Sequence, residues 1–110
     1  MSEFLIDPVA HATFGTSRST KADLVRGAHL FLGLNCFEPG QEQRVHHHDG
    51  VDKFYLILSG KARMAVGADQ FEVGPGALVW APANLPHGVL LALERTVMMI
   101  GMSPPPGETA

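Results

Sequence analysis

Three of the six histidines form the run His46-His47-His48, which Asp49 follows directly. Alternate side chains of a β-strand lie on one face, so His46 and His48 would point the same way and His47 the opposite way. Two imidazoles placed like this are the strand counterpart of a helical pair of zinc-ligating histidines. The spacing indicates a metal site, although a solvated histidine-rich turn explains the run equally well.

A third ligand has to come from elsewhere in the chain. His87 is the best candidate, because it follows the rigid segment 82–86 (PANLP) and opens an apolar stretch. Imidazole suits manganese, iron, nickel, zinc and copper, so the ligand type does not select the metal. His11 and His29 have no partner at a useful spacing, and for them a surface or core role is favoured.

Strands must position these residues, because short apolar or alternating segments recur between turns rich in Gly, Pro and Asp. We predict strands at residues 22–26, 29–37, 43–48, 53–58, 61–66, 70–73, 77–81, 88–93 and 96–102, with a possible edge strand within 1–11. The chain shows no helical periodicity. It therefore predicts an all-β barrel or sandwich of about ten short strands.

The composition narrows the class of protein. The 110 residues fit one domain, which we divide into an N-terminal arm or edge strand (1–20), a barrel (21–102) and a disordered tail (103–110). A net charge of -3 with 17% charged residues offers no basic surface for nucleic acid or for a membrane. The single cysteine, Cys36, excludes an internal disulfide, and the N-terminus lacks a signal-peptide pattern. These features predict a cytoplasmic protein.

The spacing around the histidine run resembles the first motif of the cupin family. That motif is a Gly, five residues, His-x-His, three or four residues, a Glu, six residues and a Gly. Here Gly40, His46, His48 and Gly60 follow the spacing.

A second stretch resembles the second cupin motif, which is a Gly, five residues, Pro-x-Gly, two residues and a His. Gly76, Pro82 and His87 follow this spacing, and Asn84 stands in the place of the Gly. The resemblance implies a single-domain cupin β-barrel, also called a double-stranded β-helix or jelly roll.

The resemblance also implies one divalent metal inside the barrel. The ligands that carry over are His46, His48 and His87. The position of the family's Glu is ambiguous: counting back from the closing glycine gives Lys53, and counting three residues on from the histidines gives Asp52. Asp52 would face the metal only if a bulge at residues 49–51 re-aims it. A fourth ligand at Asp52, a histidine-only site, and an inward Lys53 that opposes metal binding all remain open.

Cupins that resemble this chain include dioxygenases, isomerases, decarboxylases and lyases. The resemblance thus implies a small metalloenzyme acting on a small organic acid or carbonyl compound, with Tyr55 or Lys53 transferring protons. By strand alternation Tyr55, Ile57, Val89 and Leu91 should also face inward. The alternatives are a non-catalytic cupin that binds or senses a small ligand and a structural cupin. A homodimer is expected by resemblance, whereas a DNA-binding role is not.

Overall fold

The computed structural model describes residues 2–47 and 49–107. Within these residues the chain forms nine strands and one short 3-10 helix, η1 (Pro8–His11), which confirms the predicted all-β fold. The strands are β1 (Thr20–Arg26), β2 (Phe31–Phe37), β3 (Gln43–His46), β4 (Asp52–Ser59), β5 (Ala62–Val66), β6 (Asp69–Val73), β7 (Leu78–Ala81), β8 (His87–Ala92) and β9 (Thr96–Ser103). None of the described segments is a helix long and apolar enough to cross a membrane.

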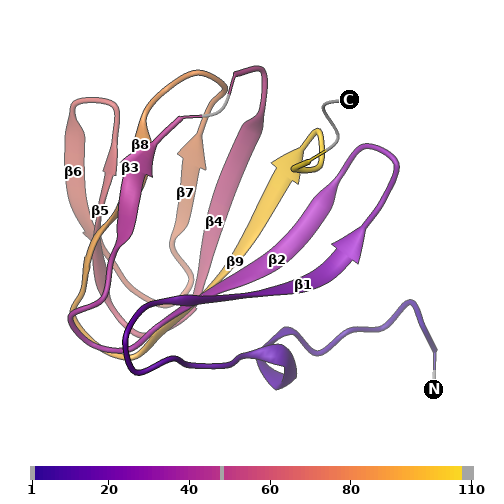
Figure 1. The fold of residues 1–110 in the computed structure, drawn as a ribbon, viewed down its shortest axis with the longest axis horizontal. Coiled ribbons are helices and arrows are strands. Elements are labelled where there is room, and N and C mark those ends of the chain that lie inside the picture. Colours follow the sequence, from indigo (N-terminus) through magenta and orange to yellow (C-terminus); the bar gives the residue numbers. More distant parts are fainter. Residues whose placement is uncertain (1, 48, 108–110) are drawn as a thin grey trace.

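The strands make two antiparallel sheets, with the orders β1-β2-β9-β4-β7 and β3-β8-β5-β6. Figure 1 shows the two sheets facing each other across the interior. Apolar side chains from both sheets fill this space, because alternation along each strand directs every second residue inward. The buried cluster is Phe31, Phe37, Tyr55, Ile57, Ala62, Met64, Val73, Val79, Ala81, Val89, Ala92, Met98, Ile100 and Met102.

The N-terminal arm does not form the edge strand considered for residues 1–11. Among the residues described from position 2 onward, η1 is the first regular element and β1 begins only at Thr20. Ala12 and Phe14 instead pack on the outer face of the five-stranded sheet, against Leu34, Cys36 and Val97. The arm therefore covers one side of the sheet, and burial raises the pKa of the Cys36 thiol.

Residues 103–107 differ from the predicted disordered tail. Ser103 is the last residue of β9, and the carbonyl of Pro106 accepts a hydrogen bond from Arg26 Nη1 at 3.0 Å. The predicted disordered tail therefore does not begin at residue 103. Residues 108–110 of that prediction lie outside the described part of the chain.

Two residues of the cupin-like motifs have a left-handed backbone. Gly60 has φ = 90°, and a Cβ atom there would collide with the Arg95 carbonyl and with Thr96. Asn84 has φ = 70°. Asparagine tolerates this region better than most residues with a side chain, which explains how it replaces the motif's glycine.

A bulge in β8 changes one predicted orientation. In the β5–β8 ladder Met64 lies opposite Val89, whereas Arg63 lies opposite Leu91, so Leu90 is an extra residue. Val89 is fully buried as predicted, but Leu91 is 39% exposed. The inward position predicted for Leu91 is therefore wrong.

Candidate functional site

The hydrogen-bonded strands β3 and β8 bring two of the predicted metal ligands together. His46 and His87 are direct cross-strand partners, and their ring centroids are 4.9 Å apart with an interplanar angle of 58°. His87 is buried, whereas His46 is half-buried. Residues 41 positions apart in the sequence thus form one imidazole pair on the wall of the barrel.

Backbone carbonyls orient both rings in the same way. Nδ1 of His46 lies 2.6 Å from the carbonyl oxygen of Arg44, and Nδ1 of His87 lies 2.9 Å from that of Leu85. A carbonyl can only accept, so each Nδ1 carries the proton in the neutral ring. The lone pair of each ring is then on Nε2, which is the nitrogen that could ligate a metal.

The third predicted ligand, His48, lies outside the described residues. In the part of the chain that is described, no three His, Cys, Asp or Glu side chains are grouped closely enough to hold a metal ion. The described portion of the site therefore consists of the histidine pair, His46 and His87, and its surroundings.

The course of β4 decides which residue faces the interior beside the histidine pair. Pairing of β4 with β9 is regular from Asp52 to Ile57, so successive side chains alternate between the two faces. Lys53 is 4% exposed and points inward, while Asp52 is exposed. An oxygen of the Asp52 carboxylate accepts a hydrogen bond from the backbone N–H of Ala83 at 3.0 Å. The structure therefore does not bring Asp52 together with His46 and His87.

Lys53 is a buried cation inside the barrel. Its Nζ lies over the ring of Tyr55, 4.6 Å from the centroid. Burial, and secondly the positive charge of Lys21, lower the pKa of Lys53 to about 8. Among the described residues, neither the Glu38–Arg95 ion pair nor the contact between His47 and Asp49 includes Lys53. The ammonium group is thus stabilised by an aromatic face but is not neutralised by a described carboxylate.

Tyr55 links the lysine to the histidine pair. Its ring makes an edge-on contact with His87, with centroids 6.1 Å apart. Its hydroxyl donates a hydrogen bond to Gln43 Oε1 at 2.8 Å. The side chain is completely buried, and burial raises the pKa of the phenol. The hydroxyl therefore stays protonated at neutral pH, and proton transfer by Tyr55 or Lys53 stays a prediction.

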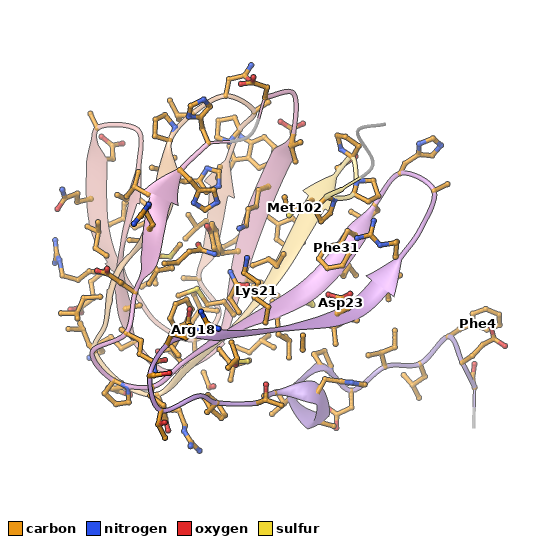
Figure 2. All side chains as sticks on the ribbon, viewed as in Figure 1. Phe4, Arg18, Lys21, Asp23, Phe31 and Met102 are labelled. Carbon is orange, nitrogen blue, oxygen red and sulfur yellow. The ribbon has the colours of Figure 1, made fainter. Side chains whose placement is uncertain are left out.

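A pocket of about 500 Å³ opens beside these residues, and it includes His46, Gln43 and Lys53 in its wall. Strands β1 and β2 supply much of the remaining wall, and Figure 2 shows Lys21, Asp23 and Phe31 on that side of the molecule. The full lining is Lys21, Ala22, Asp23, Arg26, Phe31, Gly33, Leu34, Asn35, Gln43, Arg44, His46, Lys53, Ile100, Met102 and Pro106. Four of these side chains are basic and one is acidic, although the whole chain carries a net charge of -3.

Asn35 is a site residue that the motif spacing did not reveal. It is 3% exposed, it lines the pocket, and its Nδ2 has no hydrogen-bond partner among the described residues. An unsatisfied buried amide costs about 1–3 kcal/mol. The signal in the sequence was a polar residue within the apolar segment 29–37.

Comparison with known proteins agrees with this architecture. The crystal structure of TT1209 from Thermus thermophilus superposes with a TM-score of 0.87, at 29% identity over 93% of this chain and 98% of that one. KdgF from a Halomonas species gives a TM-score of 0.76 at 20% identity over 82% of each chain, which shows a shared fold. An uncharacterized Streptomyces coelicolor protein, SCO3923, is 29% identical over 74% of this chain and 76% of its own length.

The sequence model of the cupin domain matches residues 33–100. This segment runs from β2 to β9 and so includes the histidine pair, Lys53 and both glycine-bounded motifs. With the two-sheet barrel around them, the match establishes that the chain belongs to the cupin family.

Proposed function

We propose that this cupin holds a divalent metal through His46, His48 and His87 and binds a small organic acid or carbonyl compound in the adjoining pocket. The observation that carries the proposal is the orientation of His46 and His87. Both rings have Nδ1 on a backbone carbonyl, which assigns the lone pairs to Nε2.

The donor types fit a borderline divalent ion such as manganese, iron, nickel, zinc or copper. A bound ion of this kind would polarise an oxygen atom of the ligand. Lys53 supplies no ligand while it is an ammonium, so we favour a histidine-only site. Because three neutral imidazoles leave the charge of the metal uncompensated, the site would favour a ligand that carries negative charge.

Metal content measured on protein purified without a metal-affinity tag tests the proposal. Reconstitution after chelation should restore about one equivalent per chain, and His87→Ala should weaken metal binding at least about 100-fold. His29→Ala is the matched control, because His29 is exposed and lies outside the pocket. Metal content that does not rise on reconstitution, or equal uptake by both variants, would reject the proposal.

A metal-free binding protein is the second candidate function. It is favoured by the inward Lys53, whose charge opposes a cation in the same barrel. This candidate predicts ligand binding that is unchanged by chelators, and metal content that stays low after reconstitution.

We also propose that two copies of the chain pair through the region of β7. This strand is at the edge of its sheet, and its Leu78 and Trp80 are 67% and 56% exposed. An uncovered edge with apolar side chains favours association with a second strand or sheet. Light scattering should give the mass of a dimer for the natural chain and for Leu93→Asp, and that of a monomer for Trp80→Asp. A natural chain that is monomeric would reject the pairing.

A further inference from the structure

The pocket contains two lysines, one of which is buried. Lys53 on β4 and Lys21 on β1 both line the pocket, and they are close enough for the charge of Lys21 to act on Lys53. Neither the Glu38–Arg95 ion pair nor the contact between His47 and Asp49 includes a lysine, and these are the only such pairs among the described residues. Two like charges in one partly enclosed pocket repel each other unless a negative charge lies between them.

Asn35 lies beside Lys21 and lines the same pocket as Lys53. It is the direct cross-strand partner of Lys21, and cross-strand partners share a face of the sheet. The residue lines the pocket, and its buried Nδ2 has no hydrogen-bond acceptor in the described chain. A buried donor of this kind is normally satisfied, so its position points to an acceptor that the described part of the chain does not provide.

We propose that Lys53, Lys21 and Asn35 form a binding site for an oxyanion, the carboxylate or phosphate group of a small metabolite. Two ammonium groups would neutralise the charge, and the amide would donate a hydrogen bond to one oxygen. The inference rests on the proposed function for the pocket in which the ligand lies, but it needs no metal. It assigns the sign of the ligand's charge and the residues that recognise it.

The rest of the lining agrees with a small anionic metabolite. Phe31, Ile100 and Met102 provide apolar surface beside the charged groups, as in most small-molecule sites. Asp23 is the one acidic residue of the lining, and it is outnumbered by four basic residues. A cationic ligand would have to be buried beside Lys53, which Coulomb repulsion disfavours.

Calorimetric titration of chelator-treated protein with malonate tests this site, with neutral malonamide and inorganic phosphate as the other two probes. We expect malonate or phosphate to bind and malonamide not to bind. Binding of malonate alone would indicate a carboxylate ligand, and binding of phosphate alone a phosphate ligand. Equal binding of malonate and malonamide, or no binding of either anion, would overturn the proposal.

Single substitutions then assign the recognition residues. Lys53→Met, Lys21→Met and Asn35→Leu should each weaken binding of the anion about tenfold or more. The control is Lys61→Met, because Lys61 is exposed and outside the pocket. Lys21 is exposed too, so its variant keeps the test valid if a buried substitution impairs folding. Unchanged affinity in Lys21→Met and Lys53→Met would overturn the assignment.

The two proposals fail separately. If the protein takes up metal but its chelator-treated form binds neither anion, the oxyanion site alone is rejected. Metal uptake that is absent while the chelator-treated protein still binds malonate would reject the metal proposal and support the oxyanion site.

Discussion

The candidate site has two polar regions that are satisfied in different ways. In the histidine pair, each Nδ1 has a backbone carbonyl as partner, so the chain itself orients the rings. In the second region, which we call the lysine cluster (Lys21, Asn35 and Lys53), the described chain provides no carboxylate for Lys53 and no acceptor for the Asn35 amide. The first region is preorganised by the fold. In the second, we propose that a ligand supplies the missing acceptor and negative charge.

Lys53→Glu should change the metal affinity and the anion binding of the two regions most, because it places a carboxylate where the cupin motif has one. Opposite charge beside the metal should raise metal affinity about tenfold or more, since the interaction is strong in a partly buried site. Malonate binding should fall below detection, because the cation is replaced by an anion. Competition with a chromogenic chelator measures the first effect and calorimetry the second. A variant with unchanged metal affinity would show that residue 53 does not face the ion.

Lys53→Met tests the energetic cost of the lysine cluster without ligand. Removing the buried charge should raise the free energy of unfolding by about 3 kcal/mol at pH 7, because the lowered pKa of Lys53 reflects the cost of burying its charge. The folded pKa lies below the unfolded value, so the cost is full below pH 8 and declines as the pH rises from about 8 to about 10.5.

Urea unfolding at pH 7 and pH 10 measures this difference, with Lys61→Met as the exposed control. The gain for Lys53→Met should be smaller at the higher pH. An equal gain at both values, or a loss at pH 7, would contradict the description of Lys53 as a buried and uncompensated cation.

Tyr55→Phe should have a smaller effect, because it removes one hydrogen bond and keeps the ring. Loss of the bond to Gln43 should lower stability by about 0.5–1.5 kcal/mol. The ring contacts with Lys53 and His87 remain, so metal affinity should stay within about twofold. Denaturant unfolding and metal titration on the same sample separate the effect on stability from the effect on metal affinity. A large loss of metal affinity would instead assign the hydroxyl to the site.

Asp52→Asn should affect the site least. Its side chain is on the outer side of β4 and contacts the Ala83 N–H, so the histidine pair does not depend on its charge. Metal affinity should be unchanged, and stability should fall by less than about 1 kcal/mol. A tenfold loss of metal affinity would show that Asp52 is a ligand after all.

The strands and their order of appearance could be predicted from the sequence because alternation and turn residues are local signals. The same signals predicted the inward faces of β4 and of the start of β8, including Tyr55 and Val89. They failed at Leu91, because the bulge at Leu90 is set by pairing with β5, and no local pattern marks it. The prediction of an edge strand in the N-terminal arm failed for a similar reason, because the arm packs on Leu34 and Cys36 through tertiary contacts.

The site was predictable to the extent that it lies in the two motifs. The pairing of His46 with His87 follows from them, but the choice between Asp52 and Lys53 does not. That choice depends on how many residues the turn before β4 uses, which the structure resolves through the regular ladder from Asp52 onward. Lys21 and Asn35 were missed because their strands precede or only begin the matched segment. They join the pocket because β1 and β2 belong to the same sheet as β9 and β4.

The left-handed Asn84 has a consequence for protein engineering. Its Oδ1 accepts a hydrogen bond from the backbone N–H of Gly50 at 2.9 Å, so the loop before β8 is tied to the loop before β4. These are the loops that follow the first histidines and precede the last one. A graft that transplants either motif alone into another barrel would break this tie. The two motifs should be moved together as one module, and a glycine at position 84 would preserve the backbone while releasing the loops from each other.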